Sequence, residues 1–219
     1  MELICTAILF DLDGVLVNSS TVVERHWKRW AERHGVSYEH LKEVMHGRTL
    51  AETIRITAPH LDAEQEGRIH EAQESIDTDG LEVYRAACEL LRSLPAHNWA
   101  VVTSGSYRTA STRLQYGEFP TPPILVTAED VQRGKPDPEA FLLAATCLGV
   151  RPEQCVVVED SPVGVEAARA AGMRVIAVAT THGLEALGRA DIIALGIADV
   201  TVETAGNQFR VTVEPMSVE

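Results

Sequence analysis

The stretch ILFDLDGVLV (residues 8–17) decides how the rest of this 219-residue chain is interpreted. An apolar run near the N-terminus ends in two carboxylates, Asp11 and Asp13, and a glycine follows at once. Ionised carboxylates at the end of a buried strand need a counter-charge, because unpaired buried charge is costly. A divalent cation with oxygen ligands, above all Mg²⁺, supplies one. An exposed turn, where Asp and Gly are common, is the alternative.

The composition excludes some classes of partner. Lys and Arg number 19 against 32 Asp and Glu, a formal net charge of −13, which argues against nucleic acid or an anionic membrane as the main partner. A small phosphorylated metabolite is compatible if the site supplies a metal or a lysine. No apolar stretch is long enough for a bilayer, and Met1-Glu2 lacks the basic region of a signal peptide. The four cysteines show no CxxC pairing and lie in apolar contexts, which predicts buried thiols in a cytoplasmic protein.

Short β-branched runs alternate with helical patterns over most of the chain. This alternation predicts an α/β fold, a Rossmann-like parallel sheet with helices on both faces. Strands are expected at 6–10, 99–103, 124–126, 155–158, 174–178 and 191–194, and a peripheral hairpin at 200–214. Helices are expected at 107–116, 138–148 and 163–171, with glycines after the last two. In such a sheet, ligands bind beyond the carboxyl ends of the strands.

One block breaks the alternation. Between about residues 20 and 79 only helical patterns occur, at 22–34, 38–45, 51–58 and 63–76. Because this block directly follows the first strand, we expect a small all-helical cap domain over the edge of the sheet where Asp11 points. The alternative is that these helices simply pack on the sheet. The expected bounds are 18–80 for the cap, and 1–17 with 81–219 for the α/β core.

Two turn segments carry groups that suit an anion. In VVTSGS (residues 101–106), the hydroxyl of Ser104 and the amide of Gly105 follow a strand and can converge on an anion. In GKPDP (134–138), Lys135 lies between a glycine and a proline, which suits a point charge held toward phosphate. An ordinary Ser-Gly turn and a solvated surface lysine are the alternatives.

A second apolar run, VVVEDSPVG (residues 156–164), also ends in two acids, Glu159 and Asp160. Adjacent strand residues point to opposite faces, so only one of them would coordinate a metal fully unless the strand ends between them. Capping of the following helix by Asp160 is the alternative. Two acidic strand ends in one sheet would repel each other without a cation, and we expect no guanidinium beside them. The sequence therefore predicts a metal shared by the two ends.

In this order, the four motifs resemble those of the haloacid-dehalogenase superfamily, in its phosphatase branch with a helical cap after the first strand. The resemblance covers nearly the whole chain. From His46 onward the sequence is similar to the glycerol-phosphate and deoxysugar-phosphate phosphatases. The resemblance implies a Mg²⁺-dependent phosphatase that hydrolyses a small sugar or polyol phosphate through an aspartyl-phosphate intermediate.

The resemblance also implies how the core residues share the chemistry. Asp11 would be the nucleophile, and Asp13 would protonate the leaving oxygen and later activate water. Ser104 and the Gly105 amide would bind the transferring phosphoryl group, while Lys135 would neutralise its charge. This division fits phosphoryl transfer, which depends on positioning and charge neutralisation.

The resemblance implies four metal ligands in the core. Mg²⁺ would be held by the Asp11 carboxylate, the backbone carbonyl of Asp13, the Asp160 carboxylate, and Glu159 either directly or through water. In the cap, the segment MHGRT (45–49) resembles a Gly-Arg turn that reaches the substrate. Arg48 and His46 are therefore candidate substrate contacts, with a surface ion pair as the alternative for Arg48.

Sugar-phosphate mutases of this branch share all four motifs and are the main alternative. They typically carry a histidine twelve residues after the nucleophile, where this chain has Val23, and His26 lies almost one helical turn further on. This difference favours a hydrolase over a mutase. A phosphometabolite-binding protein without turnover is a third alternative, which the presence of every expected catalytic residue disfavours.

Overall fold

A parallel sheet of six strands forms the centre of the computed structural model, which describes residues 1–45, 48–206 and 208–214. The strand order is β6-β5-β2-β7-β8-β9. Their bounds are β2 (Ala7–Phe10), β5 (Trp99–Val102), β6 (Ile124–Val126), β7 (Cys155–Glu159), β8 (Arg174–Val178) and β9 (Ile192–Ala194). All six strands were expected from the sequence, and the parallel sheet is confirmed.

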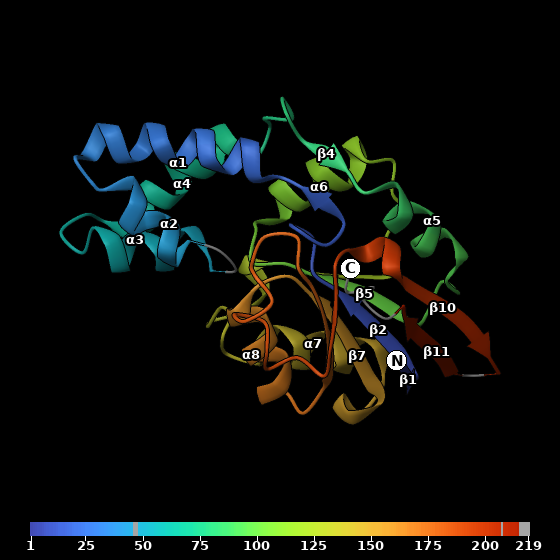
Figure 1. Ribbon diagram of the computed structural model, residues 1–219. Coiled ribbons are helices and arrows are strands. Elements are labelled where there is room, and N and C mark those ends of the chain that lie inside the picture. The colour runs from blue at the N-terminus through green and yellow to red at the C-terminus, as the bar shows by residue number, and fades with distance from the viewer. Residues whose placement is uncertain (46–47, 207, 215–219) are drawn as a thin grey trace.

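Helices cover both faces of this sheet (Figure 1). Alternate residues of β2 face opposite sides, so Phe10 packs in the cluster with α5 (Arg85–Ser93) and α6 (Tyr107–Tyr116). Leu9 packs in the other cluster, with α7 (Glu139–Leu148) and α8 (Pro162–Ala170). Burial on both sides explains why the strands read as continuous apolar runs.

The helices described between β3 (Val17–Asn18) and β4 (Glu82–Val83) form a separate lobe beside one end of the sheet (Figure 1). They are α1 (Ser20–His34), α2 (Tyr38–Val44), α3 (Leu50–Thr57) and α4 (Ala63–Glu74), and we call them the helical lobe. The lobe has an apolar cluster of its own around Trp27, Trp30 and Ile54. The short antiparallel strands β3 and β4 pair where the chain leaves the core and returns.

The expected hairpin near the C-terminus is confirmed, as β10 (Val200–Ala205) and β11 (Gln208–Val213). The sequence did not reveal that β1 (Glu2–Cys5) adds to it, antiparallel to β11. Short 3₁₀ turns complete the connections, at η1 (Ala128–Asp130), η2 (Pro152–Gln154) and η3 (Ile197–Asp199).

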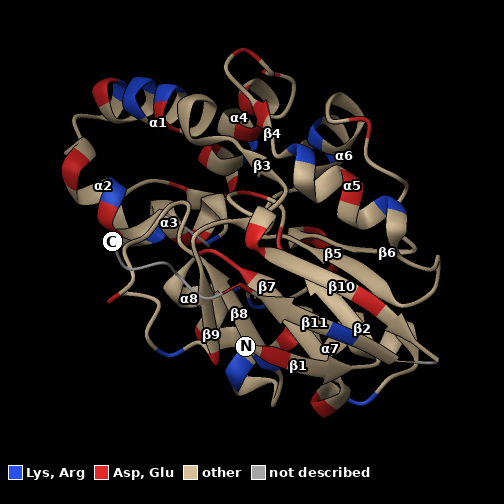
Figure 2. Cartoon of the chain, turned by 45° about the vertical axis from the view of Figure 1, so that its right-hand side comes forward, with Lys and Arg blue, Asp and Glu red and all other residues tan. Residues whose placement is uncertain are grey.

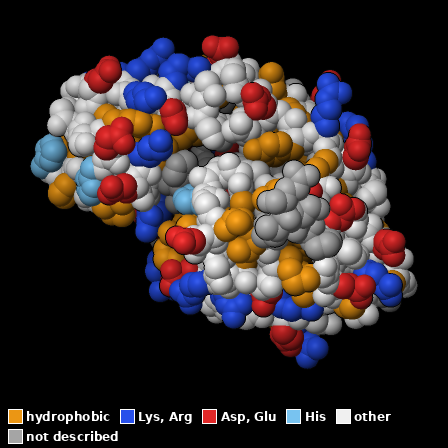
Figure 3. Space-filling view, in the orientation of Figure 1, with side chains coloured by type: hydrophobic (Ala, Val, Ile, Leu, Met, Phe, Trp, Pro, Cys, Tyr) orange, Lys and Arg blue, Asp and Glu red, His pale blue; other side chains and the backbone are white. Residues whose placement is uncertain are grey.

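The burial of the cysteines, the distribution of charge and the character of the helices bear on the sequence-based expectations. Cys5, Cys88 and Cys155 are buried free thiols, as expected, but Cys147 is exposed, so that part of the expectation is wrong. Basic and acidic residues are interspersed along the elements (Figure 2), and their side chains are interspersed over the face seen in Figure 3. Within the residues that are described, no helix combines the length and the apolar character needed to cross a membrane.

Candidate active site

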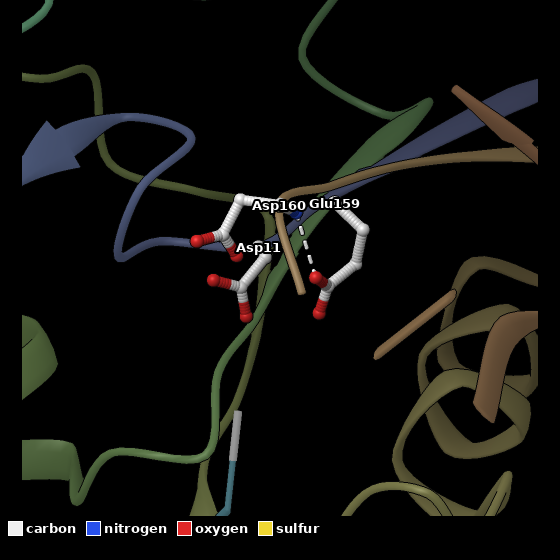
Figure 4. A group of neighbouring side chains, drawn as sticks. All are labelled: Asp11, Glu159 and Asp160. Atoms are coloured by element: carbon white, nitrogen blue, oxygen red, sulfur yellow. Dashed lines mark hydrogen bonds between the residues drawn. The ribbon is translucent and has the colours of Figure 1, made fainter. Parts of the chain in front are cut away.

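The neighbouring strands β2 and β7 bring the two acidic motifs together at their carboxyl ends. The Asp11 amide donates to the carbonyl of Val158 at 3.0 Å, which continues the pairing of the two strands. Asp11, Glu159 and Asp160 each offer a carboxylate oxygen, and these oxygens all lie within 4.8 Å of one another. In Figure 4 the carboxylates of Asp11 and Asp160 lie side by side, whereas that of Glu159 lies apart from them, near the Asp160 amide. Strand β7 ends at Glu159, so both acids join one cluster.

Lys135 contacts this cluster from the interior of the protein. Its Nζ atom is 2.5 Å from Oδ1 of Asp11 and 2.7 Å from Oε1 of Glu159, and it also donates to the carbonyl of Val102 at 3.3 Å. The residue is only 2% exposed, so the alternative of a solvated surface lysine is wrong. A buried ammonium here neutralises part of the acidic cluster and fixes the orientation of Asp11.

The cluster holds three carboxyl groups, and Lys135 supplies one ammonium to neutralise them. Burial raises the pKa of Asp11 to about 7, since it outweighs the attraction of Lys135, and Glu159 adds repulsion. Burial together with the charges of Glu159 and Asp11 also raises the pKa of Asp160 well above its usual range. The pKa of Glu159 is lowered, because Lys135 and Ser161 overcome the effect of burial. Crowded buried carboxylate oxygens with one lysine fit a divalent cation such as Mg²⁺.

Both oxygens of the Glu159 carboxylate accept hydrogen bonds from the protein. Besides Lys135, its carboxylate accepts the amides of Asp160 and Ser161, each at 2.7 Å, and the Ser161 hydroxyl at 3.0 Å. Ser161 accepts the amide of Gly164 and so caps α8, which makes the alternative of an Asp160 cap wrong. Asp160 instead accepts a hydrogen bond from the hydroxyl of Thr181, a contact that the sequence motifs did not indicate.

Asp13 pairs with an arginine that the sequence motifs did not reveal. Nη1 of Arg113 lies 2.5 Å from Oδ2 of Asp13, and Nη2 lies 2.8 Å from Oε1 of Glu74 in α4. The expectation that no guanidinium lies beside the acidic motifs is therefore wrong. Arg113 lies in the buried stripe of α6 with Ala110 and Leu114, and a cation in an apolar stripe is the signal that could have revealed it.

A cavity of roughly 560 Å³ lies between the helical lobe and this edge of the sheet. Its lining includes Asp11, Asp13, Asp160, Ser104, Gly105 and Arg48, so the structure brings these candidates to one space. The Gly105 amide donates to the hydroxyl of Thr103 at 3.0 Å. His46, the remaining candidate, lies outside the described residues.

Arg48 reaches this cavity from the helical lobe. Its guanidinium donates to the carbonyl of Val44 at 2.9 Å, which ties it to the end of α2. This contact, rather than the surface ion pair considered from the sequence, holds the side chain.

Two further carboxylates join the helical lobe to the core beside the sequence motifs. Oε1 of Glu52 in α3 accepts the amide of Gly134, the residue before Lys135, at 3.2 Å. Oε1 of Glu71 in α4 accepts the hydroxyl of Ser106 at 2.6 Å. Together with the contact of Glu74, these bonds connect the lobe to the Gly134 turn, to the Ser106 turn and to α6.

In this protein the central strands of a parallel sheet end in acids, a buried lysine contacts these acids, and a helical lobe faces them. These features define an α/β hydrolytic enzyme with a helical lobe over its site. The sequence matches the family described as haloacid dehalogenase-like hydrolase over residues 5–172, and the chain belongs to this hydrolase family.

Individual relatives span almost the whole chain. It is 39% identical over 208 residues to hexitol phosphatase A of Escherichia coli (strain K12), covering 93% of this chain and 96% of that protein. It is 31% identical over 202 residues to glycerol-1-phosphate phosphohydrolase 1 of Saccharomyces cerevisiae, covering 85% and 80%. A crystal structure of a hydrolase from Pseudomonas syringae superposes with a TM-score of 0.77 at 26% identity, covering 86% of this chain and 92% of that one.

Proposed function

We propose that this hydrolase removes the phosphoryl group from a small sugar or polyol phosphate, with Mg²⁺ bound at the acidic cluster. The observation that carries the proposal is the pairing of Asp11 with Lys135 at 2.5 Å, beside Asp160, where the two aspartates line the cavity. The names of the two curated relatives, a hexitol phosphatase and a glycerol-1-phosphate phosphohydrolase, support this substrate class.

Asp11 and Asp13 divide the two chemical steps. An oxygen of Asp11 attacks phosphorus, the bond from phosphorus to the ester oxygen breaks, and Asp13 gives its proton to that leaving oxygen. Asp13 then takes a proton from a water, which attacks phosphorus and releases Asp11. A carboxylate nucleophile thus replaces one difficult displacement by two easier ones.

The other groups hold and neutralise the phosphoryl group. Ser104 and the amide of Gly105, which would exchange its bond to the Thr103 hydroxyl for one to the substrate, bind its oxygens. Lys135 balances the charge of Asp11 from the side away from the cavity. The carboxylates of Asp11 and Asp160, the backbone carbonyl of Asp13, and Glu159 directly or through water would hold Mg²⁺. When bound, the cation supplies positive charge where negative charge accumulates during transfer.

Residues 18–80, which include the helical lobe, act as the cap over the reaction. A cavity of roughly 560 Å³ has the size typical of small-molecule sites. Arg48 lines it from the lobe and is placed to bind the part of the substrate remote from phosphorus. Exclusion of water by the lobe strengthens the charge interactions inside. The net charge of −13 disfavours a nucleic acid as substrate, and the size of the cavity favours a small cytoplasmic metabolite.

A mutase is the second candidate, and the lobe disfavours it. Val23 lines the cavity, where a mutase of this branch would place its histidine. His26 is buried, with Nε2 2.8 Å from Oδ2 of Asp77. A mutase also returns the phosphoryl group to sugar, so its product is an isomer and not free phosphate.

A screen of sugar and polyol phosphates for release of inorganic phosphate tests the proposal. We expect turnover with Mg²⁺, none with excess EDTA, and poor support by Ca²⁺, whose larger coordination shell misplaces the nucleophile. Full activity in EDTA, or isomerisation without phosphate release, would contradict the proposal.

Rapid-quench trapping assigns the two aspartates. Asp11→Asn should form no phosphoenzyme, whereas Asp13→Asn should keep the metal site and lose acid–base assistance worth ~10²–10⁴-fold. Any phosphoenzyme of Asp13→Asn should persist longer than in the wild type. A phosphoenzyme on the Asp11→Asn protein would remove Asp11 from the role of nucleophile.

A further inference from the structure

The two oxygens of the Asp13 carboxylate have different surroundings. Oδ2 lies 2.5 Å from Nη1 of Arg113, whereas Oδ1 is buried and has no hydrogen-bond partner among the described residues. A buried acceptor without a donor is costly and therefore uncommon. Asp13 lines the cavity, so its carboxylate is within reach of a ligand there, and Oδ1 is the oxygen that no donor of the described residues occupies.

Arg113 is itself held from the helical lobe. Its side chain is 6% exposed, and its second nitrogen lies 2.8 Å from Oε1 of Glu74. The other oxygen of Glu74 lies 2.9 Å from Nε2 of His70, whose ring packs on Trp27 at 4.3 Å between centroids. A continuous chain of contacts thus runs from Asp13 into the interior of the lobe.

The guanidinium of Arg113 stays charged, and its two ion pairs fix the orientation of its plane. Burial opposes its charge, but the carboxylates of Asp13 and Glu74 outweigh burial and hold the pKa of Arg113 above its ordinary value. The rigid fork of a guanidinium fixes the direction of each hydrogen bond that it makes. Removing either carboxylate would leave one terminal nitrogen of Arg113 without a partner, and the guanidinium could then rotate about its remaining contact.

We propose that Arg113 is a positioning residue for Asp13, and that Glu74 of the helical lobe sets its position. Arg113 anchors Oδ2 so that Oδ1 faces the ester oxygen of the substrate, and it does so when α4 lies against α6. Closure of the lobe and alignment of the acid–base group are then one event. The inference rests on the proposed function, because it requires Asp13 to transfer a proton.

The dependence of the rate on the leaving group separates this role from others. An alkoxide leaving group needs a proton from Asp13, whereas p-nitrophenolate leaves without one. A misplaced Asp13 therefore slows phosphoenzyme formation from an alkyl phosphate and leaves formation from p-nitrophenyl phosphate nearly unchanged. A residue that binds the phosphoryl group would affect both substrates equally.

The experiment measures phosphoenzyme formation by rapid quench with glycerol 1-phosphate and with p-nitrophenyl phosphate. For Arg113→Gln we expect a loss of ~10²-fold with the alkyl phosphate, the usual cost of a misplacement of about 1 Å, with KM nearly unchanged. Glu74→Gln should show the same contrast more weakly, and should add nothing in the Arg113→Gln background. Arg108→Ala, an exposed arginine on the same helix, is the matched control and should behave as the wild type.

Three outcomes would overturn the inference. Equal losses on both substrates would make Arg113 a structural or phosphoryl-binding residue, and a higher KM at unchanged kcat would make it a substrate contact. A faster reaction in Arg113→Gln would mean that the pair holds Asp13 in a resting position. Arg113→Lys keeps the charge but not the fork, so it gives the same comparison if thermal unfolding shows that Arg113→Gln does not fold.

Asp13→Asn, measured in parallel, distinguishes a failure of this inference from a failure of the proposed function. If Asp13→Asn slows both substrates equally, Asp13 is not the acid and the proposed function fails at that step. If Asp13→Asn shows the contrast and the Arg113 variants do not, only the positioning role fails.

Discussion

Lys135 and Asp11 are 124 residues apart in sequence, and their Nζ and Oδ1 atoms lie 2.5 Å apart in a site closed to solvent on the lysine side. The same ammonium bonds Glu159, so one cation serves both acidic motifs. Removing one partner of a buried ion pair leaves the other charge uncompensated. Lys135 is thus tied both to the chemistry at Asp11 and to the stability of the strand ends.

Replacing Lys135 by Ala should lower kcat/KM for every phosphate ester by similar factors, because Lys135 acts on the phosphoryl end that all of them share. Loss of a preorganised charge of this kind costs about 10²–10³-fold in rate. The protein should also lose ~3–5 kcal/mol of stability, the usual cost of breaking a buried pair. Steady-state kinetics on three esters of different size, with thermal unfolding, checks both effects. A loss confined to the larger esters would contradict the assignment.

Gly164 leaves room for Glu159 at the start of α8. A Cβ atom at this position would lie 1.7 Å from Oε1 of Glu159, the oxygen that bonds Lys135. Gly164→Ala should therefore lower stability and activity together, although Ala is favoured over Gly in a helix by up to ~1 kcal/mol. Gly67→Ala in α4 is the matched control. Its nearest contact would be 3.6 Å, so it should raise the melting temperature. Stabilisation by both substitutions would show that Glu159 yields easily.

The acidic cluster makes the stability of the metal-free protein depend on pH. Burial raises the pKa of Asp11 to about 7 from 3.8, so between these values the folded protein binds more protons than the unfolded chain. Its free energy of unfolding should then fall as the pH rises through this window. The raised pKa of Asp160 acts in the same direction.

Thermal unfolding in EDTA at about pH 5 and about pH 7.5 measures this fall, and Asp11→Asn should reduce it. Mg²⁺ should raise the melting temperature more at the higher pH, because it binds the deprotonated carboxylates. A difference between the two pH values that is the same in the wild type and in Asp11→Asn would show that the dependence arises elsewhere.

The sequence predicted the sheet well because strands buried on both faces and helices with capping residues leave strong local patterns. The clustering of Asp11, Lys135 and Asp160 could be predicted because each closes an apolar strand or lies in a constrained turn, and the topology brings these segments to one edge of the sheet. Arg113 was missed because its helix pattern says that its face is buried and not which carboxylate it meets. When a side chain of the core pairs with a side chain of the helical lobe far away in sequence, the pairing leaves no local sequence pattern.

The same reasoning explains the other omissions. Glu52 and Glu71 lie on half-exposed helix faces, where acidic residues are ordinary, and only the docking of the lobe places them on Gly134 and Ser106. Strand β1 was not predicted, because the expected strand began at Thr6 and residues 2–5 gave no separate strand pattern. The Thr6 amide donates to the carbonyl of Gln154, and the chain changes sheets there.

Arg48 provides the sharpest test of how the helical lobe selects a substrate. It lines the cavity from the lobe and is anchored on Val44, and among the described residues its guanidinium forms no ion pair with the core. Arg48→Ala should lower kcat/KM for the best sugar or polyol phosphate much more than for acetyl phosphate, because only the larger substrate has a remote part whose binding energy helps the transition state.

Arg29→Ala, on the exposed face of α1, controls for the loss of one positive charge from the lobe and should leave both substrates unaffected. Because Arg48 also bonds the end of α2, a thermal unfolding curve should accompany the kinetics, and a small loss of stability alone would lower both rates equally. The predicted result is instead a change in the ratio of the two kcat/KM values. An unchanged ratio with a lower rate would place Arg48 in the fold or at the phosphoryl end, and unchanged rates would leave the lobe to select its substrate through other residues.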